Sequence, residues 1–371
     1  MDVFARIVLI AAGAVAIAGT IGSAVRTVIL PRAVASRITR RVFRTLRLMF
    51  DFRVRRASYE RTDRIMALYA PISILALLLT WMLILFFAFT AIFWSLGIRP
   101  WREAFQTSGS SLLTLGFDHP HDIPNVGFVF VEAALGLFIL ALLITYLPTS
   151  YSAFSSREEM VALVSVRAGT PPSAIEMLSR YSLIEFRRGL EEWWPRWEEW
   201  FIQIEETHTS LPVLAFFRSP QPQHSWVTAA GTILDCASLV SSTVEGARQP
   251  DAELCIRSGY LALRRISAFF RIPFDADPAP DDPISITRHE FDDACRRLEA
   301  AGVPLRSDRD QAWKDFAGWR VNYDEVLLGL ALLTVAPLAE WTSDRSRSVA
   351  RTGLQLTRPQ RRRKQRRRKQ S

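Results

Sequence analysis

The sequence predicts an all-α membrane protein, with three transmembrane helices followed by a helical cytosolic domain. Residues 3–31, 65–98 and 128–151 are apolar and long enough to cross a bilayer. Between residues 171 and 351 the apolar residues recur at helical spacing instead. The chain has 371 residues, of which 49% are hydrophobic, so it has room for both a membrane part and a water-facing part.

Residues 1–31 contain the first predicted transmembrane helix. From residue 3 onward only Arg6 and Arg26 interrupt its apolar run. The alternative is a cleaved signal peptide, with Gly22-Ser23-Ala24 as its cleavage site. A signal peptide begins with a basic region, and here a single Arg is balanced by Asp2. We therefore expect this helix to be retained as a span.

Residues 32–64 form a cytosolic linker crowded with Arg, with only Asp51, Glu60 and Asp63 as acids. Short basic loops stay in the cytoplasm, so we expect the N-terminus on the outside of the cell inner (plasma) membrane. The C-terminal domain is then cytoplasmic.

The linker also has the pattern of an interfacial amphipathic helix. Its apolar stripe is Ile38, Val42, Leu46 and Met49. We expect Arg41, Arg44 and Arg47 to bind the phosphates of anionic lipid. Two alternatives are a voltage sensor, because these three arginines recur at every third position, and a solvated basic loop.

Residues 101–118, WREAFQTSGSSLLTLGFD, stand between the second and third apolar runs. They read as a short helix followed by Thr114-Leu115-Gly116-Phe117 and an acid. At membrane depth a non-helical segment is tolerated where protein buries it or where it lines a watery path. Potassium-selective pores use such a segment, TVGYG, to present backbone carbonyls to the ion.

On these residues, positions 65–169 resemble the pore domain of the two-helix potassium-channel superfamily. The match consists of an outer helix (65–98), a re-entrant pore helix with its filter (101–118) and an inner helix (128–151). The resemblance implies a homotetramer with one pore loop per chain that conducts potassium or another monovalent cation passively. The implied ion filter is Thr114, Leu115, Gly116, Phe117 and Asp118. The phrase THTSLPVLAFFRSPQPQHSWVTAAGTILD extends the resemblance to bacterial channel-like proteins with a helical cytosolic C-terminal domain.

One filter position departs from the family pattern, because Asp118 stands where the second glycine is expected. That glycine supplies a positive φ angle, which Asp adopts only at some energetic cost. The departure weakens the expectation of strict potassium selectivity. It favours the alternative function, a non-conducting membrane-anchored interaction or scaffold protein that retains the pore fold.

Acidic residues gather at the expected outer mouth. Asp118, Asp122 and Glu132 are the only charged residues between positions 104 and 156, and in a tetramer they would concentrate cations. His119 and His121 could make the mouth sensitive to acid or zinc, or could simply be exposed. Farther along, Gly136 and Pro148 of the inner helix are candidates for the gate. The alternative roles are helix packing for Gly136 and helix termination for Pro148.

The cytosolic half, residues 156–357, is predicted to be helical. Trp193, Trp197 and Trp200 share one helix face, which we expect in the core. Residues 325–338 are apolar but short, so a buried helix is expected rather than a fourth span. Residues 358–371 form a basic tail, disordered by composition and attracted to anionic lipid rather than nucleic acid.

No enzyme signature is found in the sequence. It lacks a GxGxxG motif after a strand, a phosphate-binding GxxxxGK[ST] loop and a GxSxG motif. Glu205 and His208 have the i, i+3 spacing of di-iron bundles, but such a site needs two pairs. The three cysteines have no metal-binding spacing. We therefore expect neither cofactor nor resident metal.

Overall fold

The computed structural model describes residues 3–30, 36–55, 57–118, 120–183, 191–246 and 248–345. The chain divides into two compact units, Met1–Ser152 and Ala153–Ser371. His119 and the predicted basic tail, residues 358–371, lie outside the described residues.

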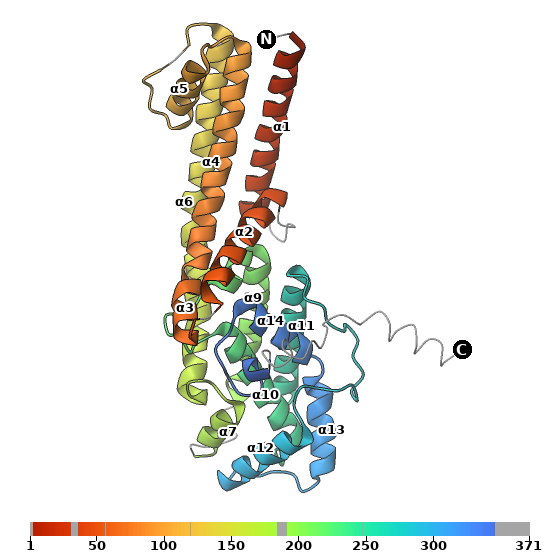
Figure 1. Ribbon diagram of the computed structural model, residues 1–371. Coiled ribbons are helices and arrows are strands. Elements are labelled where there is room, and N and C mark those ends of the chain that lie inside the picture. The colour runs from red at the N-terminus through yellow and green to blue at the C-terminus, as the bar shows by residue number, and fades with distance from the viewer. Residues whose placement is uncertain are drawn as a thin grey trace, which may run out of the picture. The chain divides into compact units, whose positions relative to one another are not determined.

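The first unit contains six helices, the last of which continues into the second unit (Figure 1). Their bounds are α1 Val3–Val28, α2 Arg37–Val54, α3 Tyr59–Ala67, α4 Tyr69–Leu96, α5 Trp101–Leu112 and α6 Ile123–Ala168. Three helical stretches are long and apolar enough to cross a membrane, namely Val3–Val28, Tyr59–Leu96 and Ile123–Ala168. The prediction of an α-helical protein with three such segments is thus confirmed.

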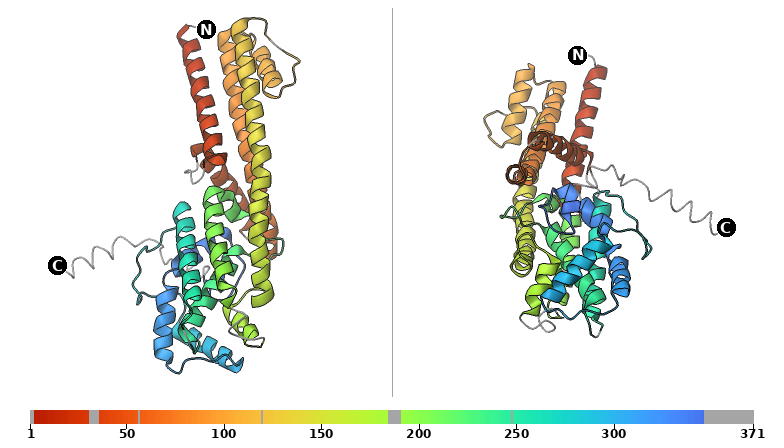
Figure 2. Two further views of the ribbon diagram at one scale, coloured as in Figure 1. Left: turned by 180° about the vertical axis from the view of Figure 1, so that it is seen from behind. Right: turned by 60° about the horizontal axis from the view of Figure 1, so that its bottom comes forward.

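Helix α4 is the centre of the first unit. Five of its residues form a hydrophobic cluster with buried residues of α1, α5 and α6. The five are Leu77, Trp81, Leu85, Phe89 and Phe93. The three long helices run alongside one another (Figure 2). A Cβ atom on Gly13 of α1 would lie 2.8 Å from Ile92 Cγ1, so α1 approaches α4 closely at that glycine.

Helix α6 is longer than the predicted inner helix, because it continues beyond Tyr151 to Ala168. Pro148 lies inside it and is exposed. A proline removes one hydrogen bond from a helix interior, and the remaining backbone bonds of this 46-residue helix hold it together. Pro148 is therefore not a helix terminator, because α6 continues for 20 residues beyond it, to Ala168.

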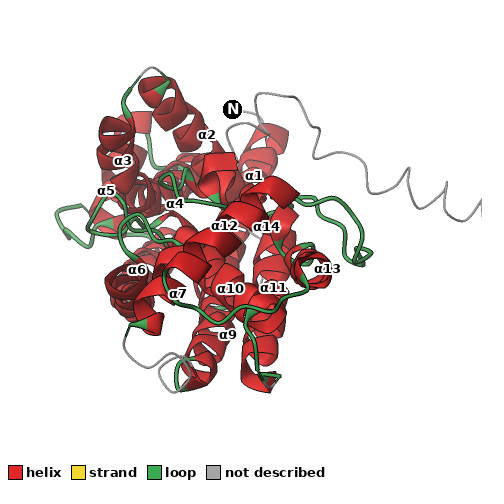
Figure 3. Cartoon of the chain, turned by 90° about the horizontal axis from the view of Figure 1, so that it is seen from below, coloured by secondary structure: helices red, strands yellow, loops and turns green. Residues whose placement is uncertain are grey.

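In the part of the second unit that the structure describes, helices are joined by loops, and one isolated bridge links Val244 and Leu305 (Figure 3). Its helices are α7 Ala174–Ser182, α9 Trp194–Ser210, the 3-10 helix η1 Pro212–Phe216, α10 Trp226–Thr243, α11 Pro250–Phe269, α12 Arg288–Ala300, α13 Arg309–Arg320 and α14 Asp324–Thr334. Nearly every residue of α10 is buried, and α10 contacts α7, α11, α13 and α14.

Two sequence predictions about this core are confirmed. Trp197 and Trp200 are buried in the hydrophobic cluster of the second unit, and Trp193 packs against its edge. Helix α14 contributes Leu327 and Leu330 to the same cluster. The apolar stretch 325–338 is therefore a core helix followed by a loop.

Candidate functional site

Helix α5 is a short polar helix packed among apolar ones. Ala104 and Leu112 join the hydrophobic cluster of the first unit. Its hydroxyl residues Thr107, Ser108, Ser110 and Ser111 are buried. A buried hydroxyl is costly unless it is hydrogen-bonded. Each of these four hydroxyls has a partner, and the partners determine how the chain leaves the helix.

The segment after α5, residues 113–118, leaves the helical path at once. The backbone N–H of Thr114 donates to Ser111 O over 2.9 Å, and that of Leu115 donates to Ser110 O over 2.8 Å. Thr114 has a φ angle of 54° and Gly116 one of 70°. A positive φ is strained for Thr and easy for Gly. Two such angles with one residue between them turn the backbone away from the axis of α5.

Ser110 holds this segment at two points. Its carbonyl accepts from Leu115, and its hydroxyl accepts from the backbone N–H of Asp118 over 3.0 Å. Within the segment, the side chains of Leu115 and Phe117 are 60% and 63% exposed. The first unit alone thus positions the backbone of the segment but does not cover its apolar side chains.

Asp118 does not take the conformation that its place in the filter motif predicted. Its φ angle is not among the positive ones, whereas those of Thr114 and Gly116 are. Thr107 Oγ1 donates instead to Asp118 Oδ2 over 2.7 Å. The side chain and the backbone of Asp118 are both bonded to α5, which explains why it does not imitate a glycine.

Glu132 was expected with the acids of the outer mouth, but the structure buries it completely. Its Oε1 lies 2.5 Å from Ser108 Oγ, and the same hydroxyl lies 3.0 Å from Phe86 O. Its Oε2 has no hydrogen-bond partner among the described residues. Glu132 therefore connects α6 to α5 and α4. The sequence did carry a signal for this role, because a single acid inside an apolar span is rarely exposed to lipid.

Asp122 and His121 are the predicted mouth residues that remain at the surface. Asp122 Oδ2 accepts from the backbone N–H of Asn125 over 3.3 Å and from its side-chain Nδ2 over 2.7 Å. Asp122 thus caps the start of α6 as well as carrying charge there. Both residues are exposed just before α6, whereas Glu132 is buried within α6.

Gly136 lies where α6 meets the end of α5. A Cβ atom at this position would be 2.6 Å from the backbone oxygen of Leu112 and 3.0 Å from its Cδ1. Real Cβ atoms do not approach backbone that closely. Close packing therefore requires a glycine here, as one of the two sequence interpretations held. A gating role for Gly136 and Pro148 stays a prediction.

The three arginines of α2 that were predicted to bind lipid do not share one environment. Arg41 and Arg44 are exposed. Arg47 is turned inward: its Nε lies 2.9 Å from Asp51 Oδ1, and its guanidinium lies over the ring of Tyr69. The predicted apolar stripe also differs, because Ile38 and Val42 pack against the cluster of the first unit. The inward face of α2 is thus an intramolecular contact.

The second unit contains a buried arginine bridge. Arg320 is fully buried and donates to Asp235, to Asp324 Oδ1 over 2.8 Å and to Trp341 O over 2.6 Å. The hydroxyl of Tyr323 also donates to Asp235, over 2.9 Å. One cation thus neutralises two buried carboxylates from α10 and α14, which gives this cluster a structural role.

A second buried group joins the last part of α6 to α9. Arg157 donates to Leu214 O over 2.7 Å and to Phe217 O over 2.9 Å. His208 Nδ1 lies 2.8 Å from Ile204 O, so Nδ1 carries the proton and Nε2 accepts from Arg157 over 3.3 Å. Burial and then the charge of Arg157 lower the pKa of His208 well below its usual value. His208 is therefore a neutral core residue.

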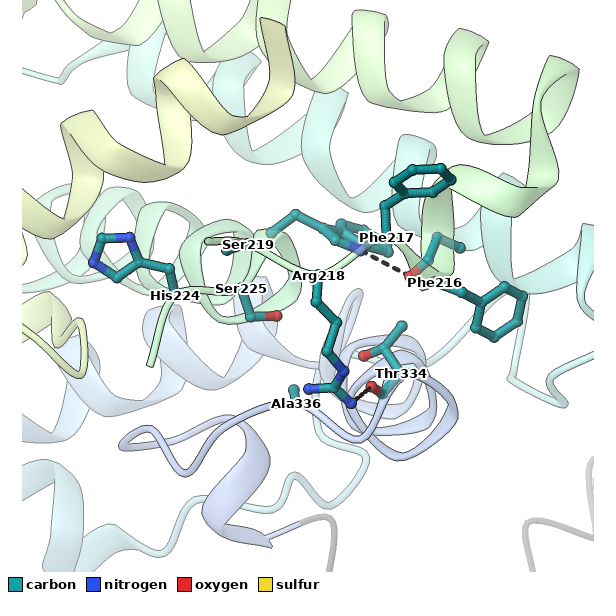
Figure 4. A pocket seen from close by; sticks show the side chains of 10 residues that line it. Phe216, Phe217, Arg218, Ser219, His224, Ser225, Thr334 and Ala336 are labelled. Atoms are coloured by element: carbon teal, nitrogen blue, oxygen red, sulfur yellow. Dashed lines mark hydrogen bonds between the residues drawn. The ribbon is translucent and has the colours of Figure 1, made fainter. Parts of the chain in front are cut away.

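The described residues of this unit form a small pocket but no cluster of metal-binding side chains. Glu205 pairs with Arg265 over 2.8 Å, away from His208. Among the described residues no three His, Cys, Asp or Glu side chains gather in a metal-binding arrangement. Figure 4 shows a small pocket lined by Arg218, His224 and Ser225, among others. The Arg218 guanidinium donates to Thr334 O at the end of α14, and this bond holds it in place.

Comparison with known proteins adds no relative. No protein family, curated protein or solved structure matches the chain. The functional argument therefore rests on the geometry around α5.

Proposed function

We propose that the chain is one subunit of a passive cation channel, with residues 114–118 of segment 113–118 as its ion filter. The supporting observation is the non-helical segment itself, which lies between α4 and α6 in the chain. Ser110 of α5 holds it at Leu115 and at Asp118. Backbone carbonyls in such a segment replace the water around a cation. The carbonyl end of α5 also carries partial negative charge, which favours a cation nearby.

The proposal also requires several copies of the chain to assemble. One chain supplies one filter segment, and a ring of carbonyls needs several copies. The exposed side chains of Leu115 and Phe117 require cover, and an apolar patch of this kind is typical of a protein interface. Four copies and potassium as the ion come from the resemblance to two-helix channels. The second unit would lie on the cytoplasmic side of the cell inner membrane, where it would regulate opening or hold the tetramer together.

The second candidate is a non-conducting scaffold with the same membrane fold. The observation that favours it is Asp118, whose carboxylate is bonded to Thr107 and whose φ angle is not that of the missing glycine. A different φ angle at this position changes the direction of the backbone carbonyls that would face an ion. Conduction and assembly must therefore be measured separately.

The test is ion flux into liposomes that contain the purified full chain, with potassium, sodium or chloride as the permeant ion. Gly116→Ala forces a side chain into a φ angle of 70° and should abolish cation flux. Gly127→Ala is the matched control, because its Cβ meets no atom within 4 Å and its backbone is helical. Cation flux that Gly116→Ala removes and Gly127→Ala retains would support the channel. A cross-linked tetramer that passes no cation at neutral or acid pH would favour the scaffold.

A further inference from the structure

Helix α2 has an outward face that none of the described residues of the first unit covers. Arg37, Arg41, Arg44, Leu48, Phe52 and Arg55 follow one another at spacings of three and four residues, which places them on one side of a helix. All six are exposed, and the apolar pair is conspicuously so, with Leu48 at 65% and Phe52 at 77%.

The opposite face of α2 holds the helix in a fixed orientation. Thr39 is buried, and its hydroxyl lies 2.8 Å from Thr27 Oγ1 of α1. The Tyr69 hydroxyl donates to Phe43 O over 3.2 Å, and the ring of Phe50 packs edge-on against Tyr69 at 5.6 Å. Because α1 and the start of α4 both contact the inward face, the arginines and the apolar pair point away from these two helices.

The connections of α2 place this face at the membrane surface. It follows the first apolar helix and precedes the stretch Tyr59–Leu96, and both are long enough to span. A helix joined at both ends to spans lies within reach of the headgroups. Basic side chains beside exposed Leu and Phe are the composition of interfacial helices, in which the cations meet phosphates and the apolar groups enter the acyl boundary.

We propose that this outward face of α2 docks on anionic phospholipid. Arg37, Arg41 and Arg44 would bind the headgroup phosphates, and Leu48 and Phe52 would insert beside the acyl chains. This assignment replaces the inward-turned Arg47 with Arg37 and the stripe at Ile38 and Val42 with Leu48 and Phe52. It depends on membrane location and not on ion conduction, so it stands or falls independently of the channel proposal.

The test is photo-crosslinking of the full chain in bilayers of phosphatidylcholine with a minor fraction of phosphatidylglycerol that has the same acyl chains. A photoreactive benzoylphenylalanine is placed at position 48, or at position 46 on the inward face as the control. Mass spectrometry then identifies the products. Position 48 should label lipid, with phosphatidylglycerol enriched at least about fivefold over its share of the bilayer. Position 46 should label protein.

Charge variants distinguish this surface from a general attraction of anionic lipid to a basic protein. Replacing Arg37, Arg41 and Arg44 together with Gln should remove the enrichment at position 48. Replacing Arg257, Arg296 and Lys314 of the second unit with Gln removes the same charge from exposed positions and should leave it unchanged. Should the triple variant of α2 fail to fold, Arg44→Gln alone should lower the enrichment. Labelling of a second copy of the chain at position 48, or lipid labelling without enrichment, would overturn the proposal.

Discussion

Replacing Gly136 with alanine tests how the end of α5 is held. The new Cβ would lie 2.6 Å from Leu112 O, which is backbone and cannot rotate away. Either α6 or the end of α5 must shift. Segment 113–118 begins at the next residue, so the strain falls on the part of the chain that we propose as the filter.

The size of the effect follows from the overpacking. Inserting a methyl group into a packed site typically costs about 1–3 kcal/mol. If the strain is released by local opening of α5, its amide protons should exchange with solvent about 5- to 150-fold faster, because exchange reports the free energy of that opening. Hydrogen-exchange mass spectrometry of peptides that cover Trp101–Leu112 measures this directly in the purified full chain.

Gly127→Ala serves as the control in the same helix. Its Cβ meets no atom within 4 Å, so the substitution should be neutral or stabilise the helix by about 0.5–1 kcal/mol. Exchange of α5 in Gly136→Ala that stays within about twofold of the wild-type rate would refute the packing argument. Gly136 would then be free to bend, and the hinge interpretation would gain support.

Three further predictions concern buried polar groups. Glu132→Gln keeps a hydrogen-bond partner for Ser108 and should leave amide exchange in α5 nearly unchanged. Glu132→Leu removes that hydrogen bond and should speed the exchange about five- to tenfold. Equal effects of the two variants would contradict the bonding role. Arg320→Met leaves two carboxylates buried without a counter-charge and should lower the free energy of unfolding by about 3–5 kcal/mol in denaturant titrations, while the exposed Arg296→Met should change it little. The pKa of His208 is lower in the folded chain than in the unfolded chain, so below pH 6.5 the unfolded chain binds one proton more. Acidification below pH 6.5 should therefore lower the free energy of unfolding by up to about 1.4 kcal/mol per pH unit. His208→Gln should flatten that part of the melting-temperature profile, and an unchanged slope would show that another group titrates.

Local patterns in the sequence predicted the elements of the fold. Long apolar runs predicted the three apolar helices, and the stretch 101–118 predicted a short helix followed by an irregular segment. These signals are local, because apolar length and periodicity are set by the residues of each element itself. For the same reason the face shared by Trp197 and Trp200 was correctly expected in the core.

The environment of individual side chains was harder to predict, because it depends on partners far away in the chain. Glu132 looked like a surface acid until Ser108, 24 positions earlier, proved to be its partner. Arg47 matched its neighbours in spacing, yet its rotation about the helix points it at Tyr69. Pro148 marked a helix end by propensity, and the neighbouring turns of α6 overrode it. In each case a tertiary contact or the rest of an element outweighed a local rule.

The composition of α5 is itself an argument about what this helix does. A helix that only filled space beside α4 would be more stable with apolar residues in place of Ser108, Ser110 and Ser111, because buried hydroxyls gain little net free energy from hydrogen bonds that replace those to water. Instead, Ser108 is hydrogen-bonded to Glu132, and Ser111 donates to Val129 O over 2.8 Å. Ser110 accepts hydrogen bonds from segment 113–118 at two points. The hydroxyls thus serve the attachment of α6 and the shape of the segment. That arrangement is expected where a precise backbone conformation after the helix matters more than the stability of the helix, and an ion filter is such a case.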